Sequence, residues 1–190
     1  WPIRSLNAAA LPPEQTCTIS REEIATLPIR RYEGAVHLIA TPQDLELAMV
    51  DIRREHTLGF DTETRPAFTK GECHLPCLVQ LATAQAVYLF QLQRVDCSTA
   101  LAELLAEPGI VKAGVAPAHD LRQLKLLFPL EPACVLDLGT IAKRRGIRQT
   151  GLRNLAGIFL GFRIPKGTRT SNWAAPRLSA AQINYAATDA

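Results

Sequence analysis

Several features that would assign a function at once are absent from this sequence of 190 residues. No apolar run approaches the roughly 20 residues that a membrane-spanning helix needs, so we expect no membrane partner. The formal net charge is only +3, which means that any basic surface for nucleic acid must be local. The first residues, beginning with Trp1, include no initiator methionine and no apolar signal segment, and we expect the sequence to be part of a longer or processed chain.

Cysteine is scarce and scattered, with five residues in an uneven arrangement. Cys73 and His74 with Cys77 resemble half of a zinc site, but no second Cys/His pair follows at the spacing of a zinc finger or knuckle. We therefore expect no zinc, and we expect reduced thiols in a cytoplasmic protein. Hydrophobic residues make up 47% and charged residues 21% of the chain, which is typical of one globular domain with a substantial core.

Apolar runs and turn residues predict alternating strands and helices. The predicted strands are 35–40, 57–63, 77–82, 86–90, 110–115 and 135–137. The predicted helices are 41–54, 99–106, 117–127, a helix ending near 145, 150–160 and a last helix from Ser179. The short turn at 83–85 makes a hairpin, whereas helices connect the later strands. This order predicts an α/β domain over 31–190 with a mixed sheet, and an N-terminal arm over 1–30.

The most informative pattern lies at the end of the second predicted strand. Asp61 and Glu63 follow an apolar run, and residues i and i+2 of a strand point to the same face. Two neighbouring carboxylates repel each other unless a cation lies between them, and Mg²⁺ or Mn²⁺ prefers such oxygen ligands. Taken alone, the pattern is common, and the start of a solvated turn explains it more often than a metal site does.

Two later segments add groups of the same chemistry. Asp120 lies in the first turn of a predicted helix, where the helix dipole favours an anion. Tyr185 and Asp189 are four residues apart, on one face of the last helix. Together with Asp61 and Glu63, these side chains match the requirements of a two-cation phosphoryl-transfer site, in which the ions bracket an in-line attack on a phosphodiester.

With these motifs, the sequence resembles the 3′–5′ exonucleases of the DEDD superfamily. The resemblance is to the tyrosine-bearing (DEDDy) branch, near RNase D and the Werner-type exonuclease domains. The resemblance covers about 33–190, and its motifs appear in the family's order. The three main motifs are Gly59-Phe60-Asp61-Thr62-Glu63, Val111–Val115 leading to Asp120-Leu121, and Tyr185–Ala190. Further matches are Leu78–Leu81, Gly151-Leu152 with Leu155, and Ser171-Asn172-Trp173.

The resemblance implies an RNase H-like fold and a metal-dependent enzyme. By motif position, Asp61, Glu63, Asp120 and Asp189 would bind two divalent cations, Mg²⁺ or Mn²⁺, and Tyr185 would hydrogen-bond the attacking water. A phenol with a pKa near 10 is a poor base at neutral pH, so orienting water is its sensible role. The products would be nucleoside 5′-monophosphates, released from the 3′ end of single-stranded or frayed DNA or RNA. The motifs do not choose between DNA and RNA.

Other residues near the motifs are candidates for binding substrate. The side chain of Thr62 points away from Asp61 and Glu63 in a regular strand, so its backbone is the expected contact with a 3′-terminal nucleotide, and Thr64 lies beside it. Phe68 and Lys70 either line the substrate entrance or belong to a solvated loop.

Three further residues have competing interpretations. Trp173 could stack on a base, but a packed tryptophan that fixes the loop before the last helix is the favoured interpretation. His119 is expected to face away from Asp120, because neighbours on a helix are about 100° apart. Lys112 is expected to extend from its strand to the surface.

The sequence departs from the family pattern at two points. The segment 116–119 is less polar than the family leads us to expect, and the family's last helix continues beyond the point where Ala190 ends this sequence.

The chief alternative to an exonuclease is a catalytically weak or inactive nucleic-acid-binding module on the same fold. An endonuclease or another phosphoesterase is a third possibility.

Overall fold

The computed structural model describes residues 18–190, apart from 70, 166 and 168–169. Within these residues, six strands form one sheet in the order β1-β4-β3-β2-β5-β6. The strands are β1 (Ala35–Ile39), β2 (Thr57–Thr64), β3 (Pro76–Ala82), β4 (Ala86–Gln91), β5 (Val111–Gly114) and β6 (Val135–Asp137).

The sheet is mixed, as the sequence predicts. The β3–β4 hairpin is antiparallel to β2, whereas β5 and β6 continue the other side of β2 in parallel. β1 lies at the edge beyond the hairpin and pairs in parallel with β4. β2 therefore lies between the antiparallel and the parallel half of the sheet, which is where the sequence places Asp61 and Glu63.

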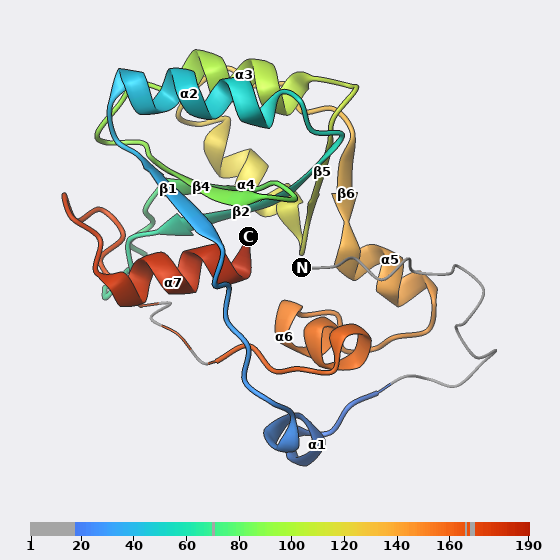
Figure 1. The fold of residues 1–190 in the computed structure, drawn as a ribbon. Coiled ribbons are helices and arrows are strands. Elements are labelled where there is room, and N and C mark those ends of the chain that lie inside the picture. The colour runs from blue at the N-terminus through green and yellow to red at the C-terminus, as the bar shows by residue number, and fades with distance from the viewer. Residues whose placement is uncertain (1–17, 70, 166, 168–169) are drawn as a thin grey trace.

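Helices cover both faces of this sheet (Figure 1). They are α1 (Arg21–Thr26), α2 (Pro42–Ile52), α3 (Ser98–Ala106), α4 (Pro117–Leu124), α5 (Leu138–Arg144), α6 (Leu152–Leu155), the π-helical turn η1 (Ala156–Leu160) and α7 (Ala180–Asp189). Local sequence explains several helix starts: Thr41 with Asp44 and Ser179 with Gln182 form capping boxes, and Pro42 occupies the first turn of α2. No helix in the described part of the chain is long and apolar enough to cross a membrane.

Two predicted helices differ from the observed ones. The helix expected over 117–127 ends at Leu124 and continues only as turns, a difference typical of frayed helix ends. The helix expected over 150–160 is divided between α6 and η1. Apolar spacing predicts that this segment is helical. It does not distinguish an α-helix, with hydrogen bonds between residues four apart, from a π-helix, with hydrogen bonds between residues five apart.

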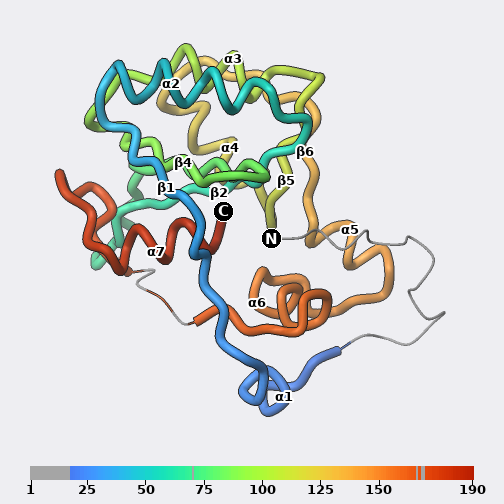
Figure 2. The backbone as a smooth tube through the Cα atoms, viewed as in Figure 1, coloured from blue at the N-terminus to red at the C-terminus, as the bar shows by residue number. Residues whose placement is uncertain are grey.

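Separate cores lie on the two faces of the sheet. One core joins β2, β3 and β4 to α2, α3 and α4 through side chains such as Phe60, Leu81 and Leu104. The other joins β3 and β4 to α7 and includes Leu78, Leu89, Trp173 and Ala186. Figure 2 shows the same arrangement in the backbone: α7 lies on one face of the sheet, and α2 and α3 lie on the opposite face.

Gly59 explains how closely α7 approaches the sheet. A Cβ atom at this position of β2 would lie 2.9 Å from the backbone carbon of Ala190. Because glycine has no Cβ, the last turn of α7 can rest directly on β2. This contact brings Asp189 to the strand that carries Asp61.

The described part of the N-terminal arm packs against the second half of the chain. Ile19, Ile24 and Leu27 lie around Gly157 of η1, and the amide of Arg30 donates to the carbonyl of Arg163 over 3.1 Å. The division of the chain into an arm over 1–30 and a domain over 31–190 stays a prediction.

Candidate active site

One cleft, of about 610 Å³, is bordered by all five motif residues. The motif residues on its walls come from the end of β2, the first turn of α4 and the last turns of α7, three segments far apart in the sequence. These motif residues are Asp61, Glu63, Asp120, Tyr185 and Asp189. Folding therefore brings together the groups that the sequence offers separately.

Alternation along β2 assigns its side chains to the two faces of the sheet. Phe60 belongs to the core under α2 and α3, so Asp61 and Glu63 lie on the α7 side and Thr62 on the opposite side. The Thr62 hydroxyl donates a hydrogen bond of 2.6 Å to Oδ1 of Asp120. The expected direction of the Thr62 side chain is correct, and the structure adds a role that the sequence did not suggest: Thr62 holds the Asp120 carboxylate at the cleft.

Burial and like charge dominate the electrostatics of the cleft. Burial raises the pKa of Asp61 to about 7, a hydrogen bond of 2.9 Å from the Thr62 amide opposes this change, and the negative charges of Asp120 and Asp189 add to it. Burial also raises the pKa of Asp189, against the opposing effects of Tyr185 and the Arg153 guanidinium. Burial is thus the main cause of the raised pKa of both aspartates, and like charge adds to it at Asp61.

Tyr185 is held as a neutral phenol. Burial is the main cause that raises the pKa of Tyr185 above its ordinary value, and its hydrogen bond to Asp189 raises it further. The ring centroid of Trp173 lies 5.9 Å from that of Tyr185, and the backbone of Gly167 contacts the tyrosine ring directly. The phenol is therefore oriented by packing, and it stays protonated at neutral pH with its O–H donating to Asp189.

The carboxylates border the cleft without forming a closed ligand set. Among the residues that the structure describes, no three His, Cys, Asp or Glu side chains are grouped closely enough to make a ready metal site. The side chains that could hold a cation here are Asp61, Glu63, Asp120 and Asp189. An open arrangement leaves room for water and phosphate oxygens beside the protein ligands.

Comparison with known proteins assigns the family. The profile of a family described as 3′–5′ exonuclease matches residues 36–190. The chain belongs to this 3′–5′ exonuclease family. The exonuclease domain thus contains all five motif residues and the whole described sheet except its first residue, Ala35.

Relatives of this exonuclease domain include enzymes named for RNA and for DNA. Ribonuclease D of Gluconacetobacter diazotrophicus is 36% identical over 156 residues, which are 80% of this chain and 39% of that protein. DNA polymerase I of Aquifex aeolicus is 30% identical over 150 residues, which are 77% of this chain and 24% of that protein. The chain spans about two fifths of the length of the curated ribonuclease D relatives that it matches.

Solved structures share the fold. The EXO domain of Aedes aegypti Nibbler superposes with a TM-score of 0.74 at 26% identity, covering 85% of this chain and 84% of that one. Escherichia coli RNase D superposes with a TM-score of 0.72 at 24% identity, covering 80% of this chain and 40% of that one. The predicted RNase H-like exonuclease fold and the predicted family are confirmed.

The other predicted substrate-binding residues have different outcomes. Thr64 borders the exonuclease cleft with Thr62, whereas Phe68 is 85% exposed and lies outside the cleft lining. Lys70 lies outside the described residues. The stacking role considered for Trp173 is wrong, because this side chain is only 1% exposed and packs in the core under α7.

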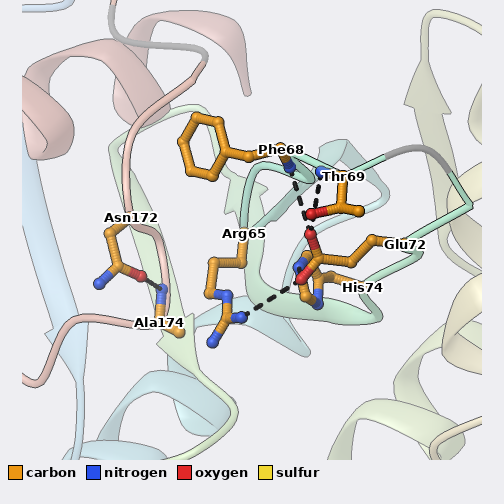
Figure 3. Close-up of polar contacts among 7 residues, drawn as sticks. All are labelled: Arg65, Phe68, Thr69, Glu72, His74, Asn172 and Ala174. Atoms are coloured by element: carbon orange, nitrogen blue, oxygen red, sulfur yellow. Dashed lines mark hydrogen bonds and ion pairs between the residues drawn. The ribbon is translucent and has the colours of Figure 1, made fainter.

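The loop between β2 and β3 is organised around one carboxylate (Figure 3). Glu72 accepts hydrogen bonds from the amides of Phe68 and Thr69, at 3.2 and 3.4 Å. Its Oε1 atom lies 2.8 Å from Nε2 of His74 and 3.7 Å from the guanidinium of Arg65. In Figure 3 the ring of Phe68 points away from Glu72. The loop thereby presents an exposed aromatic ring beside two basic residues.

Three basic residues near the site were missed by sequence reasoning. Arg65 and His74 border the cleft, and Arg153 of α6 lies near Asp189 while it donates a hydrogen bond of 2.8 Å to the carbonyl of Pro165. No spacing in the sequence distinguishes these residues from the other basic residues of the chain. The position of Arg65 two residues after the first motif is the one signal that could have drawn attention to it.

Two expectations about side-chain direction are wrong. His119 borders the same cleft as Asp120, because the first turn of α4 lies at the rim, where neighbouring side chains can both reach the opening. Lys112 does not reach the surface: it is fully buried, and its Nζ donates a hydrogen bond of 2.7 Å to the carbonyl of Glu107. A backbone carbonyl replaces water as the acceptor for this ammonium group.

Proposed function

We propose that this exonuclease domain hydrolyses the terminal phosphodiester bond at the 3′ end of single-stranded or frayed DNA or RNA and releases nucleoside 5′-monophosphates. Two divalent cations, Mg²⁺ or Mn²⁺, are held by Asp61, Glu63, Asp120 and Asp189 in this proposal. The observation that carries it is that these four carboxylates, from three separate segments, border one cleft of a domain that belongs to the 3′–5′ exonuclease family.

The chemistry of the donor set supports divalent cations. Buried carboxylates that repel one another are stabilised by a hard cation, which prefers oxygen ligands. Asp61 is such a group, because burial first and then the charges of Asp120 and Asp189 raise its pKa. When bound, such cations make water more acidic and neutralise the charge that develops on phosphate oxygens. The open arrangement of the carboxylates leaves positions for both water and phosphate.

The protein's own groups orient the reactants. Tyr185, as a neutral phenol that donates its O–H to Asp189, accepts a hydrogen bond from the attacking water and so directs it, while Thr62 fixes Asp120 in place. Arg65 and His74, at the cleft wall, are suited to contacting backbone phosphates. The exposed ring of Phe68 is suited to stacking on a base near the entrance.

The test is digestion of 5′-labelled oligonucleotides, single-stranded and duplex, in DNA and RNA forms, with Mg²⁺ or Mn²⁺. Because ribonuclease D enzymes are among the relatives, RNA is the first substrate to test. We expect products shortened stepwise from the 3′ end, and we expect Asp61→Asn to abolish them. Asp51→Asn is the matched control, since Asp51 is an exposed aspartate of α2 outside the cleft.

Two other results would replace the proposal. Binding of oligonucleotides without degradation under any of these conditions would assign the domain as a nucleic-acid-binding module. Cleavage of circular substrates, or of substrates with a blocked 3′ end, would assign an endonuclease.

A further inference from the structure

A glutamine in the middle of β3 is buried without a hydrogen-bond partner. Gln80 is fully buried, and neither its Nε2 nor its Oε1 is hydrogen-bonded by any residue that the structure describes. The other two buried glutamines are partnered: Gln91 donates to the carbonyl of Ala175, and Gln182 donates to the carbonyl of Asn172. Because a buried amide is strongly disfavoured without partners, Gln80 points to an interaction beyond those that the described side chains supply.

The register of the sheet places Gln80 beside the proposed cation ligands. Gln80 of β3 is directly opposite Asp61 of β2 in the antiparallel pair. Side chains at such positions lie on the same face, with Cβ atoms about 4.5–5.5 Å apart. Leu78, two residues before Gln80 and on the same face, packs with Ala186 of α7. Gln80 therefore lies beside Asp61 on the face of the sheet that α7 covers, and its side chain is closed to solvent.

Asp61 has hydrogen-bonding capacity to spare at this position. The described residues give its carboxylate one hydrogen bond, from the Thr62 amide to Oδ1. An ionised carboxylate has about four acceptor sites, so a donor on the buried side would fix its orientation without occupying the side that faces the cleft. The carboxamide of Gln80 provides two N–H donors at that side.

We propose that Gln80 is a positioning residue for Asp61. Its Nε2 donates to the Asp61 carboxylate through one enclosed water, and so directs the remaining lone pairs of Asp61 toward the cleft. This inference rests on the proposed function, because it treats Asp61 as a cation ligand. The interaction is of the kind by which neighbouring groups hold metal ligands in place, and loss of such groups weakens metal affinity about 10- to 100-fold.

The experiment compares Gln80→Met with Gln91→Met. Methionine keeps the length and burial of glutamine and removes its donors. Mn²⁺ affinity is measured by isothermal titration calorimetry, and the midpoint of thermal unfolding is measured in EDTA. For Gln80→Met we expect Mn²⁺ affinity to fall at least about tenfold, with an unchanged or higher unfolding midpoint. For Gln91→Met, which loses a hydrogen bond away from the cleft, we expect a lower midpoint and unchanged affinity.

Two results would overturn the proposal. One is an Mn²⁺ affinity of Gln80→Met within twofold of the wild type. The other is failure of both Gln80→Met and Gln80→Leu to fold while Gln91→Met folds, which would assign the Gln80 amide a purely structural role. A decrease in kcat with little change in KM for the folded variant would agree with positioning.

The same titration separates this inference from the proposed function. Wild-type protein that binds no Mn²⁺ would contradict the proposed function itself. Wild-type protein that binds Mn²⁺, together with Asp61→Asn that does not and Gln80→Met that binds like the wild type, would contradict only the role of Gln80.

Discussion

Replacing Thr62 by valine tests how the Asp120 carboxylate is held at the cleft. Valine has nearly the same shape as threonine and fits a strand equally well, so the substitution removes the hydroxyl and little else. Thr62 is 8% exposed, and its hydroxyl donates to Oδ1 of Asp120 over 2.6 Å. Such a short bond to a carboxylate belongs to the stronger class of protein hydrogen bonds.

The size of the effect follows from this geometry. A hydrogen bond to a charged group contributes about 1.5–3 kcal/mol. At about 1.36 kcal/mol for each factor of ten, that energy corresponds to a loss of roughly 10- to 150-fold in kcat/KM if Asp120 acts only in the held position. The effect on folding should be smaller, because the Asp120 carboxylate borders the cleft and water can replace the hydroxyl there.

The assay is initial-rate digestion of a 5′-labelled oligonucleotide with Mn²⁺, alongside urea unfolding of the same preparation. Thr57→Val is the matched control, since Thr57 is an exposed threonine at the opposite end of β2. We expect its activity to equal that of the wild type. Activity of Thr62→Val within twofold of the wild type would refute the reasoning, because it would mean that Asp120 needs no support from Thr62.

Three further predictions concern stability and metal dependence. Ala116 has a φ of 56°, a left-handed conformation that disfavours alanine by roughly 1–2 kcal/mol. Ala116→Gly should therefore raise the free energy of unfolding in urea by about 1 kcal/mol, and a decrease would contradict this account. Trp173→Ala should lower the free energy of unfolding by about 3–5 kcal/mol, because it empties a site that is only 1% exposed, and a loss below about 1 kcal/mol would contradict its place in the core. EDTA should stop digestion and added Mn²⁺ should restore it for the wild type but not for Asp61→Asn, whereas activity that persists in EDTA would exclude the proposed cations.

Local sequence predicted the parts of the fold that depend on neighbouring residues. The Ser179–Gln182 capping box marks the start of α7, and the short turn at 83–85 marks the hairpin of β3 and β4. The alternation at the end of β2 also assigned Asp61 and Glu63 to one face and Thr62 to the other, as observed. In each case the residues that decide the structure are close together in the chain, so spacing alone carries the information.

Long-range contacts were not predictable in this way. The parallel pairing of β1 with β4 depends on which strand edge is available after the hairpin forms, and β1 itself contains no sign of its partner. The direction of His119 depends on where the first turn of α4 lies relative to the cleft, and the burial of Lys112 depends on a carbonyl at Glu107. Helix and strand periodicity give the face on which a residue lies but not what covers that face.

The sequence by itself determined which groups are available for chemistry: the carboxylates and the phenol, with their order along the chain and the family that they resemble. Only the tertiary structure decided how those groups are supported. Thr62 donates a hydrogen bond to Asp120 of α4, Gly59 lets α7 rest on β2, and Gln80 is enclosed opposite Asp61. The reason is physical: covalent spacing fixes side-chain direction within one element, whereas packing between elements fixes which atoms meet.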